Sequence, residues 1–162
     1  MIRDQVEILL IEDDPEDLDL TMRALSEEHV CNQIQVARDG EEALDYLFCR
    51  GVHSERDPDC HPKLILLDLK LPKVDGLEVL EQIKSDPRTK AVPVVILTSS
   101  KQEQDLMQGY QLGANSYIQK PVDFEHFQAT IKRLGYYWLL VNQPPPAVAL
   151  NGGIPDELLS GK

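Results

Sequence analysis

The sequence predicts an α/β protein whose parallel sheet carries helices on both faces. Short runs typical of strands alternate with helical stretches along the chain, at about residues 7–11, 33–36, 64–67, 92–98 and 114–119. The third and fourth runs are almost continuously apolar, which is typical of strands buried on both faces. A repeated strand–helix alternation requires parallel strands joined by helical crossovers.

The starts of the first three helices carry capping signals. Asp14 followed by Pro15 predicts an N-cap and a first helical residue, with the helix running to about residue 28. The tetrads that begin at Asp39 and Asp75 have the form of capping boxes and open the second and third helices. Between these two helices, residues 51–62 form a polar loop that is long for a compact domain.

The last two helices close the alternation. A polar helix is expected from about residue 101 to 112, after the fourth strand. Asp123 is expected to cap a final helix that ends near Leu134, with Gly135 as the residue after its C-cap. We therefore expect one domain over residues 1–135.

Composition limits the classes of function. The chain has 162 residues, 42% of them hydrophobic, and a formal net charge of -12. This charge argues against a nucleic-acid partner and against an anionic membrane surface, since both need a basic face. Three cysteines without framework spacing, no apolar segment of about 18 residues and no signal-peptide core predict a reduced, cytoplasmic protein.

Polar side chains gather where the strands end. Parallel strands present their carboxyl ends at one edge of a sheet, and that edge carries Glu12, Asp13, Asp68, Thr98 and Lys120. In a flavodoxin-like strand order, 2-1-3-4-5, the first and third strands are neighbours, so the three acids lie close together. They stay ionised together only around a cation, and oxygen ligands of this kind suit Mg²⁺.

The same edge is suited to a phosphoryl group. Lys120 supplies a compact positive charge and Thr98 a hydroxyl donor, whereas no nucleotide-binding glycine motif and no nucleophilic triad is present. The simplest remaining chemistry is phosphorylation of Asp68 itself, because a carboxylate can be a covalent acceptor.

These residues also resemble a known family, the receiver domains of two-component response regulators. The resemblance covers about residues 5–134 and rests on dispersed elements in matching order and spacing. They are Ile11-Glu12-Asp13-Asp14, the aliphatic run into Asp68, Leu71-Pro72-x-x-Asp75-Gly76, Thr98-Ser99 and Tyr117-x-x-Lys120-Pro121. The chain departs from the commonest pattern of this family at Glu12, where the acidic pair is Glu-Asp rather than Asp-Asp.

The resemblance implies roles for individual residues. Asp68 would be the phosphoacceptor, with Mg²⁺ held by Asp13, Asp68 and the backbone carbonyl of Lys70, and Glu12 would act through water. Thr98 and Tyr117 would form a switch pair that alters the surface near the fourth helix and fifth strand. The peptide bond between Lys120 and Pro121 would be cis.

A narrower resemblance concerns the partner. The long loop before Asp68, the Lys-Leu-Pro-Lys segment after it, and the Tyr-Tyr-Trp…Pro-Pro-Pro ending are similar to single-domain regulators partnered with phytochrome-type histidine kinases. The resemblance therefore implies a sensor histidine kinase, in particular a phytochrome, as the source of the phosphoryl group.

Residues 136–146 form a separate apolar and proline-rich segment. It begins with Tyr136, Tyr137, Trp138, Leu139 and Leu140. A run of large apolar residues does not fit one face of an amphipathic helix, so we expect an extended arm that lies on a second copy in a homodimer. The alternative is a continuation of the last helix that packs on its own domain. Residues 147–162 are expected to be a flexible tail.

The sequence as a whole indicates a stand-alone regulator that is phosphorylated and is not an enzyme in the usual sense. One rival is a haloacid-dehalogenase-like phosphatase, but that family needs a second Asp two residues after the nucleophile, where this chain has Lys70. The other rival is a pseudo-receiver, an interaction module that is never phosphorylated, and the complete set of acids, hydroxyl and lysine argues against it.

Overall fold

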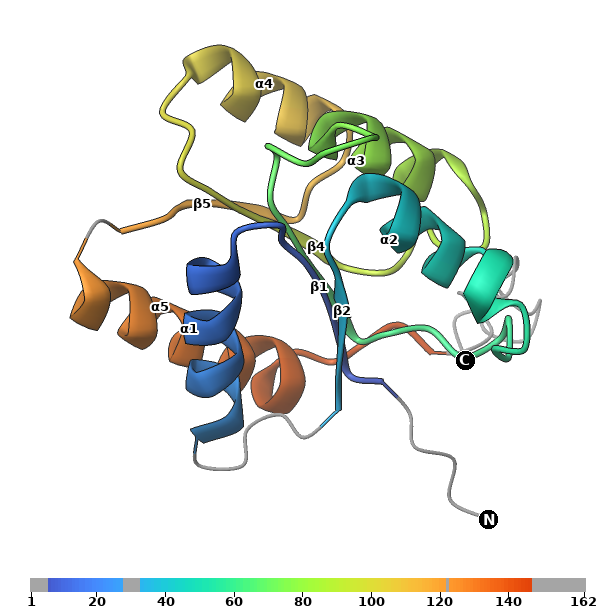
Figure 1. Ribbon diagram of the computed structural model, residues 1–162, viewed down its shortest axis with the longest axis horizontal. Helices are drawn as coiled ribbons and strands as arrows, with labels where there is room; N and C mark the ends of the chain where they lie inside the picture. Colours follow the sequence, from blue (N-terminus) through green and yellow to red (C-terminus); the bar gives the residue numbers. More distant parts are fainter. Residues whose placement is uncertain (1–5, 28–32, 122, 147–162) are drawn as a thin grey trace, which may run out of the picture.

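The computed structural model describes residues 6–27, 33–121 and 123–146 and contains a five-stranded parallel sheet (Figure 1). The strands are β1 (Ile8–Ile11), β2 (Ile34–Ala37), β3 (Leu64–Leu67), β4 (Val94–Thr98) and β5 (Ser116–Gln119). They lie in the order β2-β1-β3-β4-β5, and every neighbouring pair is parallel. The predicted fold class and strand order are confirmed.

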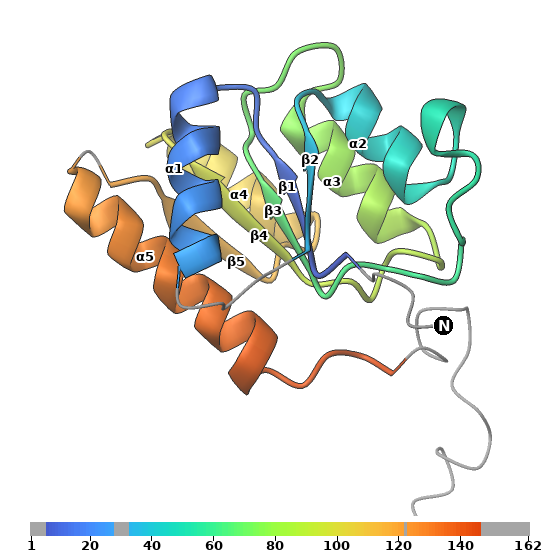
Figure 2. The same cartoon turned by 60° about the horizontal axis from the view of Figure 1, so that its bottom comes forward.

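Helices cover both faces of this sheet (Figure 2). They are α1 (Pro15–Ser26), α2 (Gly40–Leu47), α3 (Gly76–Ser85), α4 (Glu103–Gln111) and α5 (Phe124–Tyr136). Alternate strand residues face opposite ways: Leu9 and Ile11 pack in the core beneath α2 and α3, while Ile8 and Leu10 pack in the core beneath α1 and α5. Within the described ranges, none of these helices combines the length and the apolar content that crossing a membrane would need.

The predicted caps are present at three helices and wrong at one. The side chains of Asp14, Asp39 and Asp123 each accept backbone N–H bonds from the first turn of α1, α2 and α5. Asp75 is the N-cap residue of α3, but its side chain makes no capping hydrogen bond. The start of α3 instead packs against the loop after β3, where the Gly76 N–H donates to the Leu69 carbonyl over 3.0 Å.

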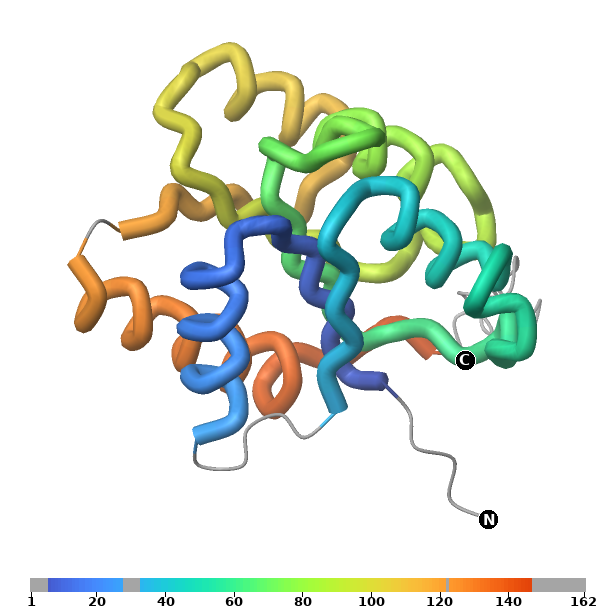
Figure 3. Tube along the Cα trace, viewed as in Figure 1, coloured from blue at the N-terminus to red at the C-terminus, as the bar shows by residue number. Residues whose placement is uncertain are grey.

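The segment between α2 and β3 is organised by one arginine. It begins with a short 3-10 helix at Gly51–His53 and lies beyond the C-terminal end of α2 (Figure 3). The guanidinium of Arg56 lies 4.0 Å from the ring centroid of Tyr46 and donates hydrogen bonds to the Tyr46 carbonyl, the Cys49 thiol and the Cys60 carbonyl. These contacts fold a polar loop of this length into an ordered structure.

The C-terminal segment differs from the prediction. α5 does not end at Gly135, which is buried, and the chain continues beyond Tyr136 as a π-helical turn at Tyr137–Val141. The apolar positions of α5 recur every three or four residues and continue into this turn, so Trp138 and Leu139 pack against the core beneath α1 and α5. The expected extended arm is therefore wrong for residues 136–141, and only residues 142–146 lack helical structure.

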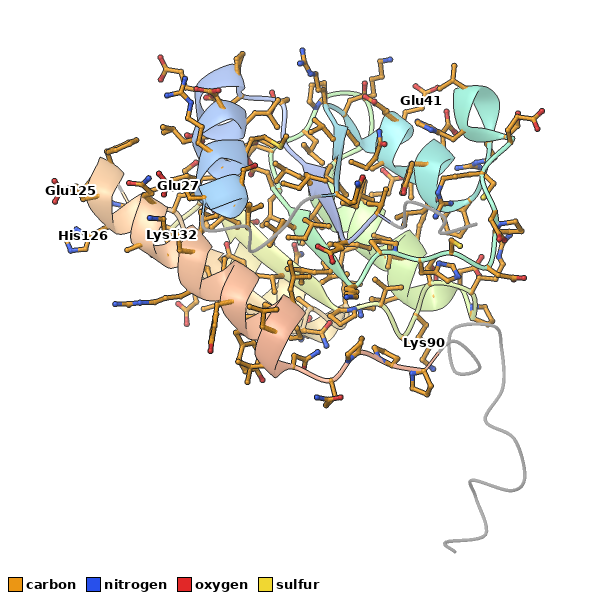
Figure 4. The ribbon with its side chains drawn as sticks, turned by 90° about the horizontal axis from the view of Figure 1, so that it is seen from below. Glu27, Glu41, Lys90, Glu125, His126 and Lys132 are labelled. Carbon is orange, nitrogen blue, oxygen red and sulfur yellow. The ribbon has the colours of Figure 1, made fainter. Side chains whose placement is uncertain are left out.

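A polar contact also joins the two helices on that face. The Nζ atom of Lys132 on α5 lies 2.6 Å from a carboxylate oxygen of Glu27 at the end of α1, and Figure 4 shows both side chains between the helices. Because this pair is largely exposed, its contribution to stability is small. The predicted flexible tail at 147–162 lies outside the described residues.

Candidate functional site

Three carboxyl groups converge where β1 and β3 end. The register pairs Ile11 with Leu67, so the residues that follow, Glu12 and Asp68, leave neighbouring strands at the same level. The Asp68 N–H donates to the Ile11 carbonyl over 3.1 Å, which holds the two strand ends together. One carboxylate oxygen from each of Glu12, Asp13 and Asp68 lies within 4.8 Å of the others, as the sequence predicts.

This group fits a hard divalent cation. Its donors are all oxygens, and among the residues that the structure describes it is the only such cluster of three or more metal-ligand side chains. The Oε2 atom of Glu12 is buried and has no hydrogen-bond partner within the described ranges. A buried carboxyl oxygen normally has a partner, so an ion coordinated here would satisfy it.

Lys120, which follows β5, faces these acids. The side chain of Lys120 is 8% exposed, and its Nζ atom lies 2.9 Å from Asp68 Oδ2 and in contact with Glu12 Oε1. The backbone N–H of Lys120 donates to the Thr98 carbonyl over 2.7 Å, which fixes the end of β5 beside β4. The predicted pairing of Lys120 with the phosphoacceptor candidate is therefore present.

Burial and these contacts shift the ionisation of the acids in opposite directions. Burial raises the pKa of Glu12 to about 8, and the neighbouring Asp68 carboxyl adds to the rise. Burial also acts to raise the pKa of Asp68, but the hydrogen bond with Glu12 and the charge of Lys120 hold it below its ordinary value. A divalent cation bound to these acids would favour the ionised form of Glu12 and so oppose the rise in its pKa.

Lys120 remains charged in this environment. Burial acts to lower its pKa, but hydrogen bonds to Asp17 and Glu12 outweigh that effect and raise the pKa above the ordinary lysine value. Asp17 is the functional contact that sequence reasoning missed. Its Oδ2 atom lies 2.8 Å from Lys120 Nζ. An acid in the first turn of a helix is ordinarily explained by the helix dipole, so only its spacing from Asp13 could have drawn attention to it.

Thr98 ends β4, and Tyr117 lies on the neighbouring strand β5, close to Gly109 of α4. Thr98 is fully buried, and its Oγ1 atom accepts a 3.3 Å hydrogen bond from the Ser100 N–H. The Tyr117 ring packs against the core beneath α2 and α3, and its hydroxyl is buried.

The loops after β3 and β5 complete the edge of the site. The backbone N–H of Lys70 donates to Asp68 Oδ1 over 3.2 Å and so helps to orient that carboxylate. The described chain contains no cis peptide bond, so the bond between Lys120 and Pro121 is trans and the cis prediction is wrong. The trans form is the intrinsically favoured isomer, and with it Lys120 already reaches the acids.

Comparison with known proteins assigns this site to a family. Residues 8–132 match the model of the response regulator receiver domain. The chain is 44% identical over 138 residues to the probable methanogenesis regulatory protein FilR2 of Methanothrix harundinacea, covering 85% of this chain and 86% of that protein. It is 38% identical over 132 residues to response regulator Rcp1 of Synechocystis, covering 82% and 88%.

Solved structures agree with the sequence matches. The phosphorylated cyanobacterial phytochrome response regulator RcpA superposes with a TM-score of 0.82 at 39% identity, over 88% of this chain and 99% of that one. A Mn²⁺-bound form of Rcp1 superposes with a TM-score of 0.81 at 35% identity, over 87% and 99%. With the three acids and the lysine arranged as described, this chain belongs to the response regulator receiver family.

Proposed function

We propose that Asp68 accepts a phosphoryl group from a histidine kinase with the help of Mg²⁺, in the cytoplasm, and that the phosphorylated protein signals by contact with other proteins. The observation that carries the proposal is the 2.9 Å contact between Lys120 Nζ and Asp68 Oδ2, beside the carboxyl groups of Glu12 and Asp13. A nucleophilic carboxylate, a cation site and a fixed ammonium are the groups that phosphoryl transfer to a side chain needs.

The transfer follows from these positions. An oxygen of Asp68 attacks the phosphorus atom of a phosphohistidine, the P–N bond breaks, and the imidazole leaves with the electron pair of that bond. The Lys120 ammonium neutralises charge on the transferring oxygens. When bound, Mg²⁺ supplies further positive charge there. Its proposed ligands are Asp13, Asp68 and the Lys70 carbonyl, with Glu12 acting through water. Hydrolysis of the acyl phosphate by water returns Asp68 and releases inorganic phosphate.

The signal would pass through Thr98 and Tyr117. A phosphoryl oxygen on Asp68 would be a charged acceptor for the Thr98 hydroxyl, whose oxygen accepts a 3.3 Å bond from the Ser100 N–H. Movement of Thr98 would change the space available to the Tyr117 ring and hence the surface of α4 and β5. Thr98→Val should then be phosphorylated without a change in hydrogen exchange across α4 and β5, whereas Thr98→Ser should keep that change.

Intact-mass measurement tests the central proposal. Incubation with acetyl phosphate and Mg²⁺ should add one labile phosphoryl group to the wild-type chain. Asp68→Asn should gain none, and Asp19→Asn, which removes an exposed acid of α1, should gain one as the wild type does. No mass gain in the wild type would favour a pseudo-receiver, and rapid consumption of acetyl phosphate without accumulation would favour a phosphatase.

A phytochrome-type kinase is the partner we propose. The support is the likeness to RcpA, described as a cyanobacterial phytochrome response regulator, together with the sequence features around residues 51–62 and 136–146. Transfer should be measured from a phosphorylated phytochrome-type kinase and, in parallel, from an unrelated histidine kinase. Equal transfer rates from both would count against a phytochrome as the specific partner.

We also propose a homodimer that uses the exposed side of the C-terminal turn. Tyr136, Tyr137, Leu140 and Val141 are exposed, next to Trp138 and Leu139 that pack inward. Exposed apolar side chains in one stretch are typical of an interface. Leu140→Glu should give a later, monomeric elution volume, whereas Val52→Glu, at a far more exposed apolar residue, should elute as the wild type. Identical elution of all three proteins would contradict the dimer.

A further inference from the structure

Asp17 is a fourth acid at the site and lies outside the group that would hold the cation. It belongs to the first turn of α1, and its side chain is 32% exposed while that of Lys120 is 8% exposed. Its backbone is well fixed, because the Asp17 N–H donates to the capping Asp14 side chain and the Asp17 carbonyl accepts from the Thr21 hydroxyl. The carboxylate of Asp17 is thus presented to Lys120 from a rigid position.

The hydrogen bonds of Lys120 are fully assigned. A lysine ammonium has three N–H donors, and Nζ of Lys120 contacts one carboxyl oxygen each of Glu12, Asp17 and Asp68. Two of these three partners, Glu12 and Asp68, belong to the cluster that a divalent cation would use. A bound cation and the ammonium therefore compete for the same two carboxyl groups, and Asp17 is the partner for which they do not compete.

We propose that Asp17 is a positioning residue that keeps the Lys120 ammonium on the α1 side of the site. A divalent cation can then bind at Glu12, Asp13 and Asp68 while Lys120 keeps its ion pair with Asp17. This inference rests on the proposed function, because it assumes that cation and lysine act together at Asp68. With an amide at position 17, the acidic partners that Lys120 keeps among the described residues are Glu12 and Asp68, which the cation also needs. Cation binding then has to break more of the lysine's ion pairing.

Titration of the unphosphorylated full chain with Mg²⁺ by calorimetry tests this directly, with no phosphodonor present. Asp17→Asn should weaken Mg²⁺ binding by about fivefold or more relative to Asp19→Asn. Asp19 is the matched control, because it lies on the same helix, is exposed, and pairs with Arg23 instead of Lys120. Asp17→Glu, which restores the acid, should recover most of the affinity and also serves if Asp17→Asn folds poorly.

A double-mutant cycle separates positioning from simple loss of charge. In a Lys120→Met background the lysine cannot be held by any acid, so Asp17→Asn should weaken Mg²⁺ binding no more than Asp19→Asn does. The proposal is overturned if Asp17→Asn and Asp19→Asn act equally in the wild-type background. It is also overturned if the full effect of Asp17→Asn persists without Lys120, since Asp17 would then act on the cation through its charge alone.

The two proposals fail in distinguishable ways. Suppose that Mg²⁺ binding to the wild type depends on Asp17 as expected but that the protein gains no phosphoryl group. The proposed function is then wrong, and Asp17 affects cation binding without a role in phosphorylation. If the wild type is phosphorylated and Asp17→Asn binds Mg²⁺ as Asp19→Asn does, only the role of Asp17 fails.

Discussion

Two lysines at opposite ends of the sheet show how surroundings decide what one side chain does. Lys120 follows β5 and contacts three acids, Glu12, Asp17 and Asp68. Lys84, on α3, reaches the other end, where its Nζ atom donates to the Lys90 carbonyl at 3.1 Å, the Val92 carbonyl at 2.8 Å and the Asn115 side-chain oxygen at 3.1 Å. Both ammonium groups have three acceptors, but only one set includes acids.

The acceptors around each lysine determine whether its ammonium group stays charged. Burial lowers the pKa of Lys84 to about 8, because no acid compensates for the water it loses. The acids around Lys120 reverse that effect and raise its pKa above the ordinary value. Lys84 also joins α3 to the segments that lead into β4 and β5, since Asn115 accepts a second bond from the Val94 N–H. We infer that Lys84 stabilises the fold, whereas Lys120 serves the chemistry.

The largest expected effect comes from exchanging each lysine for methionine and measuring phosphorylation. Lys120→Met should slow the mass gain of Asp68 from acetyl phosphate by about a hundredfold, because the transferring oxygens lose a fixed positive charge. Lys84→Met should leave the rate within about twofold of wild type, since it lies at the other end of the sheet. Similar slowing by both variants would contradict the division of roles.

The next effect concerns stability. Lys84→Met leaves three acceptors without their donor and should lower the free energy of unfolding by about 1–3 kcal/mol, measured by urea denaturation. Lys101→Met, at an exposed position before α4, is the control and should change it by less than about 0.5 kcal/mol. If Lys84→Met lowers the free energy of unfolding no more than Lys101→Met does, Lys84 does not stabilise the fold.

The smallest effect is on the pH dependence of stability. Between pH 8 and 10.5 the unfolded chain keeps a proton on Lys84 that the folded chain releases, because the folded pKa is the lower one. The unfolding free energy of the wild type should therefore rise with pH across this window relative to Lys84→Met. The measurement is the difference between the two urea stability curves at each pH, and a constant difference would contradict the lowered pKa.

The sequence was sufficient for the arrangement of the strand ends. Glu12, Asp68 and Lys120 each follow a predicted strand, and a parallel sheet must bring such residues to one edge. The contact of Asp17 with Lys120 could not be read in the same way, because it depends on how α1 is rotated against the sheet. The spacing of residues in a helical segment shows which of them share a face, but it does not show the direction in which that face points.

The C-terminal turn shows a different limit. The run from Tyr136 to Leu140 is more apolar than a helix with one buried face predicts, and Gly135 has the character of a residue that follows a helix C-cap. The periodicity of the buried side of α5 nevertheless continues to Trp138, and it outweighs the local glycine. The exposed tyrosines of the turn cover the other side of the helix, which a linear reading cannot separate from the buried side.

α4 has a feature with consequences for the whole surface around it. Gly109 is its one buried residue, and a Cβ atom there would come within 2.8 Å of the Ile96 side chain and 3.4 Å of the Tyr117 ring. The helix thus rests on the sheet by its bare backbone, while Met107 and Tyr110 face solvent. A helix that buries so little of its surface can tilt or slide at a low energetic cost.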